Sequence, residues 1–169
     1  MLQTQRLTIV PLTYKQLLSY IKNDGSLEEE LNLYLTSREI SNELKEALEN
    51  TILPNVLNKK RDYLFSTLWT IISKKDQKTI GDLCFVGEPN ADGEVEIGYG
   101  TYEEFQGHGY MTEAVGGMID WAKSQSKIKA IIASTEKSNI ASFSVLMKNN
   151  FAKYKETETM FFWKLELKN

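Results

Sequence analysis

A glycine-containing loop that joins a predicted strand to a predicted helix is the feature that most constrains the fold of this chain. The loop, residues 105–110 (FQGHGY), follows an alternating run at residues 95–99 and precedes an amphipathic segment. Glycine lets the backbone come close to a ligand, and the first turn of a helix presents unpaired N–H groups at the positive end of the helix dipole. The sequence therefore predicts that this turn binds a phosphate group.

The residues around the loop restrict what that phosphate belongs to. No Lys-Ser or Lys-Thr pair follows, so a nucleoside-triphosphate P-loop is not indicated, and we expect a cofactor that is held rather than cleaved. A dinucleotide-binding loop fits poorly, because Thr112 replaces the third glycine of that motif and Lys129 stands where an acid should bind the ribose. The structural alternative is a tight strand-to-helix connection without a ligand.

The rest of the chain alternates between the periodicities of helices and strands. Apolar residues at helical spacing predict helices over residues 13–22, 27–35, 41–54, 111–122 and 139–148. Apolar, β-branched and aromatic runs predict strands over residues 5–10, 63–73, 79–86, 94–102, 128–134, 151–157 and 160–167. Short polar turns indicate an antiparallel meander and a final hairpin, and one strand, helix and strand make a parallel crossover. The predicted fold class is α/β, with a mixed, mostly antiparallel sheet flanked by helices.

Composition and charge argue against several classes of protein. The 169 residues, 41% hydrophobic and 25% charged, predict one globular domain over residues 1–169. A formal net charge of −3 without a basic run argues against nucleic-acid binding, and no apolar run approaches the roughly 20 residues of a membrane span. Cys84 is the single cysteine, which together with the missing signal peptide predicts a cytoplasmic location. One cysteine and one histidine give no support to a metal site.

These segments, in this order, resemble the GNAT superfamily of N-acetyltransferases. The superfamily's pyrophosphate-binding signature, Gln/Arg-x-x-Gly-x-Gly/Ala, is matched at residues 106–111, where Met111 takes the last position and predicts a more crowded loop. Other matches resemble the branch that includes ribosomal-protein N-terminal acetyltransferases: Gln5-Arg6-Leu7, Glu96-Ile97-Gly98-Tyr99, Thr112-Glu113-Ala114, Asn139-x-x-Ser142 and Lys148-Asn149-Asn150-Phe151. The resemblance covers nearly the whole chain.

The resemblance implies a fold, a co-substrate and a reaction. The implied fold is a central sheet splayed at the cofactor site, and the implied reaction is direct transfer of acetyl from acetyl-CoA to a primary amine in one ternary complex, without a metal. The acceptor is a protein N-terminus or a small-molecule amine, neither nucleic acid nor a membrane is an expected partner, and a homodimer is compatible with the family. The implied cofactor-binding residues are Gly100, Thr101, Gln106, Gly107, His108, Gly109, Tyr110, Met111, Thr112, Asn139 and Lys148.

Two residues are implied as catalytic. Glu96, at the splay, is positioned to take a proton from the incoming amine, directly or through water. Its alternative is a strand carboxylate that faces the surface, because Glu94 and Glu96 alternate with apolar neighbours. Ser142 resembles a residue near the CoA sulfur in members that lack the usual tyrosine acid; Leu146 stands at the tyrosine position here. The alternative for Ser142 is an ordinary helical serine.

Three of the cofactor-binding predictions also have simpler explanations. Asn139 is a good N-cap for the following helix, and capping alone would account for it. Lys148 binds the adenosine phosphate or is a solvated charge. The His108 side chain faces solvent or the phosphates, with general-base catalysis as the alternative role.

Two rival functions accompany the acetyltransferase prediction. The missing tyrosine and the crowded Met111 position favour a non-catalytic acyl-CoA-binding module. A second rival keeps the enzyme but changes the acceptor to a polyamine, amino acid or drug. No motif in residues 14–58 identifies the acceptor.

Overall fold

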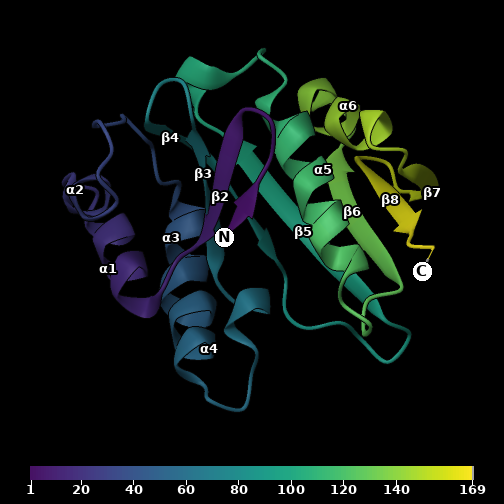
Figure 1. Ribbon diagram of the computed structural model, residues 1–169. Coiled ribbons are helices and arrows are strands. Elements are labelled where there is room, and N and C mark those ends of the chain that lie inside the picture. The colour runs from purple at the N-terminus through teal and green to yellow at the C-terminus, as the bar shows by residue number, and fades with distance from the viewer. Residues whose placement is uncertain (169) are drawn as a thin grey trace.

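A single sheet of eight strands runs through residues 1–168, the part of the chain that the computed structural model describes. Its strand order is β1-β2-β3-β4-β5-β6-β8-β7. All neighbouring strands are antiparallel except β5 and β6, which are parallel (Figure 1). The strands are β1 (Leu2–Gln3), β2 (Leu7–Pro11), β3 (Leu68–Ser73), β4 (Lys78–Phe85), β5 (Glu94–Thr101), β6 (Ala130–Glu136), β7 (Ala152–Glu156) and β8 (Met160–Glu166).

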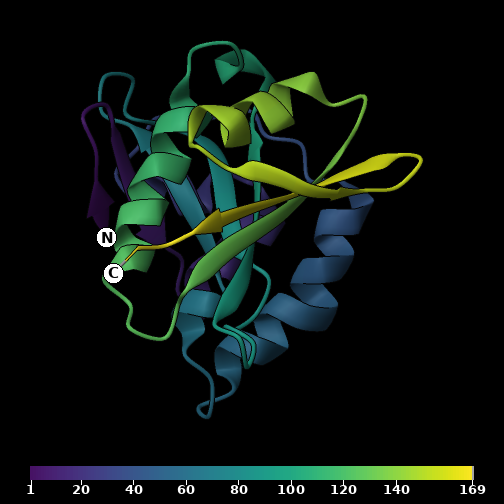
Figure 2. The same ribbon diagram turned by 90° about the vertical axis from the view of Figure 1, so that its right-hand side faces the viewer.

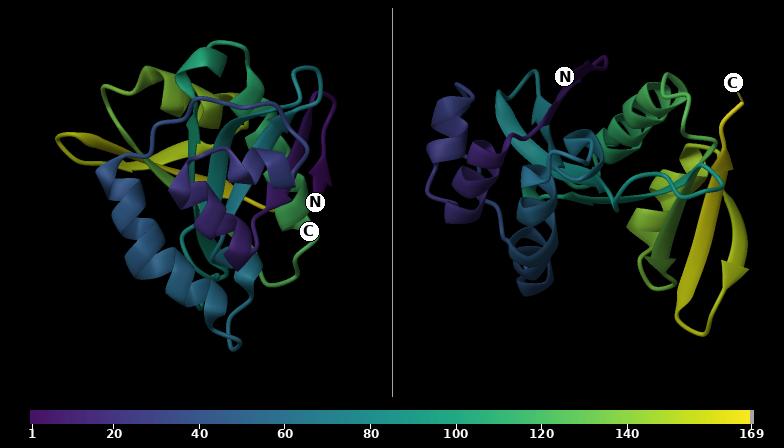
Figure 3. Two further views of the ribbon diagram at one scale, coloured as in Figure 1. Left: turned by 90° about the vertical axis from the view of Figure 1, so that its left-hand side faces the viewer. Right: turned by 90° about the horizontal axis from the view of Figure 1, so that it is seen from below.

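Helices cover both faces of this sheet. One face carries α1 (Tyr14–Lys22), α2 (Ser26–Glu30), α3 (Asn42–Ala47) and α4 (Leu53–Leu57), which lie in front of the strands in the left view of Figure 3. The opposite face carries α5 (Tyr110–Lys123) and α6 (Ile140–Lys148). Side chains alternate across the strands, so the sheet contributes to two separate hydrophobic clusters, one under α5 and one under α1.

The two halves of the sheet are joined by a short parallel ladder. Only Glu94, Val95 and Glu96 of β5 pair with β6. Beyond Glu96, β5 continues its pairing with β4 as far as Thr101, whereas β6 continues its pairing with β8. The β7–β8 hairpin forms the far edge of the second half (Figure 2) and is set apart from β1–β4 in the view from below in Figure 3. The splay that the family resemblance implied is therefore present.

The predicted meander, crossover and final hairpin are confirmed, and the predicted ends of three elements are wrong. The strand expected from residue 63 begins at Leu68, because a 3₁₀ turn over Tyr63–Phe65 precedes it, capped by Asp62. The acidic helix expected to reach residue 35 ends at Glu30. No helix among residues 1–168 is long and apolar enough to cross a membrane.

The helix predicted to end at Pro54 continues to Leu57. A π-helical turn over Leu48–Ile52 precedes α4, and Pro54 occupies its first turn. The helix is continuous at this point, and in the π turn the Leu53 N–H bonds to the Leu48 carbonyl, which replaces the regular i→i−4 bonding directly before the proline.

Two glycines inside α5 are explained by close packing. A Cβ atom on Gly117 would lie 2.8 Å from Thr4 Cγ2, and one on Gly116 would lie 3.3 Å from Asn149 Oδ1. The turn between β1 and β2 and the end of α6 therefore approach α5 more closely than an alanine would allow. This packing offsets the roughly 1 kcal/mol that each glycine costs in a helix.

Candidate active site

The predicted phosphate loop has the geometry of an open anion site. Gly107 and Gly109 have φ angles of +79° and +74°, and Gly109 is the N-cap of α5. No side chain caps this helix, so the N–H groups of its first turn are not occupied by a capping oxygen. The Met111 side chain is buried in the core, so the crowding expected from it does not arise. Proline fixes φ near −65°, so a proline at position 109 would disrupt the loop itself.

A clasp formed by Thr4, Arg6 and Glu113 holds this loop. Arg6 Nη1 donates to the carbonyl of His108 at 3.0 Å, and its guanidinium lies 4.7 Å from the centre of the Tyr110 ring. Glu113 Oε1 accepts from the Arg6 backbone N–H at 2.7 Å and from the Thr4 hydroxyl at 2.6 Å. Burial alone would raise the pKa of the Glu113 carboxyl, but hydrogen bonds from Thr4 and Arg6 outweigh it and lower that pKa. The clasp fixes the first turn of α5 in place.

We expect Arg6→Ala to weaken CoA binding by about 3- to 10-fold, because the loop loses one hydrogen bond and a nearby positive charge. Calorimetric titration with CoA measures this. Arg6→Lys keeps the charge but not the planar fork, so it should recover only part of the affinity. Wild-type affinity in Arg6→Ala would show that the clasp does not contribute to the site.

Glu96 lies where β5 and β6 separate. It is the last residue of β5 that pairs with β6, and its side chain projects from the α1–α4 face beside Gly98. Ser134 Oγ lies 3.4 Å from Glu96 Oε1 and donates to it. Glu94, in contrast, is engaged by Lys164 at 2.7 Å. No lysine or arginine among residues 1–168 pairs with Glu96, so its carboxylate is not neutralised.

On the other side of the splay, α6 spans the distance from β5 to the phosphate loop. Asn139 caps the helix, its Oδ1 accepting from the Ser142 N–H at 3.0 Å. Ser142 Oγ donates to the Tyr99 hydroxyl oxygen at 3.3 Å, and that hydroxyl donates to the Ser142 carbonyl at 2.8 Å. Burial raises the pKa of Tyr99. At the other end of α6, Asn149 Nδ2 donates to the Thr112 carbonyl in the first turn of α5 at 3.0 Å.

The remaining predicted site residues lie in three places. Gly100, Thr101 and Gln106 line a cavity beside β5, where Gln106 Nε2 donates to the Thr101 carbonyl at 3.2 Å. Lys148 is exposed at the end of α6, and the His108 side chain is exposed on the loop. Leu146 is fully buried in the core. Within residues 1–168, no three His, Cys, Asp or Glu side chains gather as a metal ion would require.

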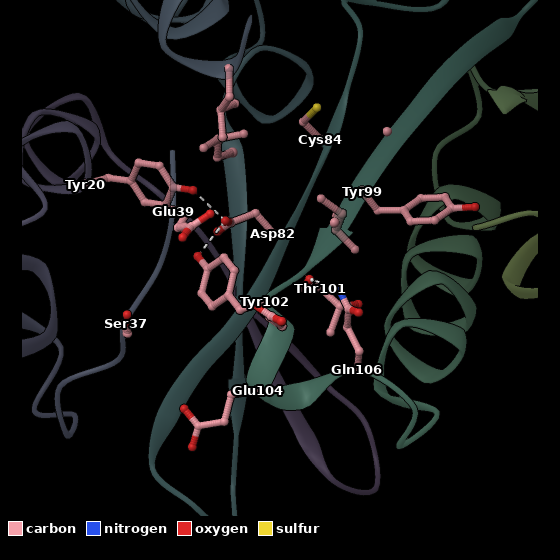
Figure 4. A pocket seen from close by; sticks show the side chains of 16 residues that line it. Tyr20, Ser37, Glu39, Asp82, Cys84, Tyr99, Thr101, Tyr102, Glu104 and Gln106 are labelled. Atoms are coloured by element: carbon pink, nitrogen blue, oxygen red, sulfur yellow. Dashed lines mark hydrogen bonds between the residues drawn. The ribbon is translucent and has the colours of Figure 1, made fainter. Parts of the chain in front are cut away.

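The cavity, about 990 Å³ in volume, contains a carboxylate that sequence reasoning missed. Asp82 Oδ2 accepts from the Tyr20 hydroxyl at 2.7 Å and from the Tyr102 hydroxyl at 2.6 Å, and both rings point toward it in Figure 4. An acidic residue inside the predicted strand at 79–86, on the same face as Cys84, was the signal available. Burial raises the pKa of the Cys84 thiol to about 11, so Cys84 is no thiolate nucleophile.

Burial dominates the electrostatics of this cluster. It raises the pKa of the Asp82 carboxyl, while hydrogen bonds from Tyr102 and Tyr20 and the charge of Arg38 act against that rise. Burial also raises the pKa of both tyrosines, so they remain protonated donors. Behind Tyr20, the buried Arg38 forms an ion pair with Glu28, with 2.8 Å between Nη1 and Oε1. The Arg38 guanidinium lies 4.5 Å from the centre of the Tyr20 ring.

Comparison with known proteins identifies the family of this chain. The family model described as Acetyltransferase (GNAT) domain matches residues 6–152. An uncharacterized N-acetyltransferase of Bacillus subtilis (strain 168), YjdG, is 34% identical over 83 residues, which are 49% of this chain and 49% of that protein. The match thus spans about half the length of that relative.

Solved structures share the fold. Ribosomal-protein-S5-alanine acetyltransferase from Vibrio fischeri has a TM-score of 0.68 at 17% identity, over 98% of this chain and 95% of that one. Spermidine N-acetyltransferase from Vibrio cholerae, in complex with CoA and spermine, has a TM-score of 0.67 at 11% identity, over 97% of each chain. At these identities the likeness concerns the architecture alone.

Proposed function

Because the chain belongs to the GNAT acetyltransferase family, we propose that it transfers an acetyl group from acetyl-CoA to a primary amine within one ternary complex. The observation that carries this proposal is the backbone of residues 97–101, which pairs with β4 on one side and is free on the side toward β6. Tyr99, within this segment, contacts Ser142 of α6, and the uncapped start of α5 follows the segment along the chain. An extended ligand with a pyrophosphate at one end and a thioester at the other fits this arrangement.

The residues present suit such a ligand along its whole length. The N–H groups of the first turn of α5, beside Gly107 and Gly109, suit the pyrophosphate. The free edge of β5 and the Asn139 side chain suit the amides of the pantetheine arm. Lys148, near the loop end of α6, suits the adenosine phosphate. His108 contributes its carbonyl to the clasp, so its imidazole needs no role in binding.

The chemistry then requires two proton transfers. The amine nitrogen attacks the thioester carbon, the new N–C bond forms, the C–S bond breaks, and the CoA sulfur leaves with the electron pair. Glu96 takes the proton that the amine must lose. A free N–H of β5 stabilises the oxyanion, and positioning in one complex supplies the remaining advantage. Ser142, in contact with Tyr99, donates a proton or hydrogen bond to the thiolate.

The experiment that tests the proposal is a thiol-release assay with acetyl-CoA and a panel of amines, amino acids and N-terminal peptides. Release that depends on one class of acceptor, with the acetylated product identified by mass spectrometry, would support it. CoA binding without transfer to any acceptor would support the non-catalytic acyl-CoA-binding module instead. Leu146 is the specific observation in favour of that second candidate, because a buried leucine supplies no acid where many GNAT enzymes have a tyrosine.

We expect Ser142→Ala to lower kcat on the order of 10-fold, with little change in KM for acetyl-CoA, because a serine hydroxyl is a weak acid. Tyr99→Phe removes the partner hydroxyl and tests whether the pair acts together. Steady-state thiol release with the best acceptor measures both variants. Full kcat in Ser142→Ala would mean that water protonates the thiolate or that another step limits the rate, and a pre-steady-state burst separates these cases. Leu146→Tyr is not a useful companion, since it would overpack the core.

A further inference from the structure

The cavity beside β4 and β5 carries a charge pattern that acetyl transfer by itself does not require. Four acidic residues belong to its lining, namely Glu39, Asp82, Glu103 and Glu104. No lysine, arginine or histidine lies among the lining residues of this part of the chain. At the rim, Lys78 Nζ lies 3.7 Å from Glu104 Oε1, and behind the lining the Arg38 guanidinium lies against the Tyr20 ring. A cavity of one sign with partly apolar walls concentrates ligands of the opposite sign, which here are cations.

Asp82 is the part of the lining that points to a specific ligand. The residue is only 8% exposed, and its Oδ1 has no hydrogen-bond partner among residues 1–168. The hydroxyl of Thr70, opposite it on β3, lies near the same carboxyl and acts to lower its pKa, although the two atoms are not within ordinary hydrogen-bond geometry. Nearby, Arg38 and Glu28 pair with each other, so one guanidinium stands against two carboxyl groups. The cluster therefore has one carboxyl group more than it has cations, and a cationic ligand would favour the ionised form of Asp82, which burial disfavours.

The two tyrosines determine which kind of cation fits. Each phenol has a single proton, and both protons are donated to Asp82. Toward any further group, the oxygens of Tyr20 and Tyr102 can therefore only accept hydrogen bonds. An ammonium group offers three donors and a positive charge, and so matches this set. A carboxylate would meet only acceptors and negative charge.

The position of Asp82 separates this cation from the reacting amine. Asp82 pairs with Gly100 in the β4–β5 ladder, whereas Glu96 lies four residues earlier on β5. Both residues project from the same face of the sheet, and four residues of strand span about 13 Å. A charge held at Asp82 therefore belongs to a part of the acceptor several atoms away from the nitrogen that is acetylated beside Glu96.

We propose that this cavity selects linear diamines and polyamines, with the distal ammonium held by Asp82, Tyr20 and Tyr102 while the proximal amine faces the thioester. For the reacting end the inference rests on the proposed function, but binding of the distal ammonium does not. A matched set of probes isolates that charge: cadaverine carries two amines, n-pentylamine lacks the second, and δ-aminovalerate replaces it with a carboxylate.

The test is calorimetric titration of CoA-loaded protein with each probe. Without an acetyl group no transfer can occur, so this measures binding apart from catalysis. We expect cadaverine to bind about 10- to 100-fold more tightly than n-pentylamine, and δ-aminovalerate to bind least. In the thiol-release assay the same order should appear in KM. A binding preference without any acetyl transfer would overturn the proposed function and leave this inference standing.

Variants locate the effect. Asp82→Asn should reduce the affinity for cadaverine about 10-fold or more and leave the affinity for n-pentylamine unchanged. Asp120→Asn, on the exposed face of α5, changes the net charge equally and should change neither. Glu39 is exposed at the rim, so Glu39→Gln leaves the buried cluster of Asp82, Tyr20 and Tyr102 intact. We expect this variant to bind cadaverine about 2- to 3-fold more weakly. Equal affinities of wild-type protein for cadaverine and n-pentylamine, or a folded Asp82→Asn that keeps the difference, would overturn the inference.

Discussion

Glu96→Gln is expected to lower kcat/KM for the acceptor by roughly 10²-fold or more at neutral pH, because a glutamine cannot take the proton of the incoming ammonium. The loss should shrink at high pH, where the free amine is already neutral. CoA affinity should stay close to wild type, since the side chain projects from the face opposite α5 and α6. The measurement is a pH–rate profile of both enzymes with the same acceptor.

Glu94→Gln is the matched control for this experiment. It removes an equal charge two residues away on the same face of the strand, but Glu94 is held by Lys164 and lies farther from the splay. It should therefore keep most of the activity at every pH. If Glu96→Gln follows the wild-type profile, Glu96 is a structural carboxylate supported by Ser134, and the amine loses its proton to water.

Gly109→Ala is expected to weaken CoA binding by about 10- to 100-fold. A residue with a Cβ atom is strained at a φ of +74°, so the loop must shift, and the first-turn N–H groups of α5 then lose alignment with the pyrophosphate. Losing one charge-assisted hydrogen bond costs about 1.5 to 3 kcal/mol, which corresponds to this range. Calorimetry with CoA gives the affinity, and chemical denaturation gives the free energy of unfolding.

Gly87→Ala separates loop geometry from general strain. Gly87 has a φ of +84°, a Cβ atom there would meet nothing within 4 Å, and the residue lies in the connection between β4 and β5. Both variants should therefore lose a similar free energy of unfolding, roughly 1 to 2 kcal/mol. Only Gly109→Ala should lose CoA affinity. Equal affinities in the two variants would show that the glycine loop does not hold the pyrophosphate.

Features that depend on residues close together in the sequence could be predicted from it. Asn139 caps α6, as its side chain suggested, and Thr13, the first residue of the helix predicted over residues 13–22, caps α1 with a full capping box. Asn150 adopts a φ of +63°, which allows the turn before β7. The turn at Gly107 and Gly109 before α5 was predictable for the same reason, since it is encoded in consecutive residues, and its binding of a phosphate stays a prediction. The splay itself came from the family resemblance, because no local pattern specifies where two strands part.

The missed features all join residues far apart in the chain. Arg6 and Glu113 are separated by 107 positions, and Tyr20 and Asp82 by 62. No periodicity reports such a contact, because each of these side chains is ordinary in its local setting. Of these residues, only Asp82 could have been noticed in the sequence, because it is an acidic residue within an otherwise apolar strand. The catalytic assignments of Glu96 and Ser142 stay predictions, and the geometry adds Tyr99 as the neighbour through which Ser142 is tested.

The short ladder between β5 and β6 means that binding of the proposed co-substrate would also stabilise the fold. Only three paired residues of β5 join the two half-sheets, so a ligand that occupies the free edge of β5 adds contacts where the halves meet. By mass action, a ligand at 100 times its Kd stabilises the folded state by about 2.7 kcal/mol. Proteases act on transiently opened chains, whose population follows that free energy. The amount of this protein that survives in a starved cell should then fall with the supply of CoA.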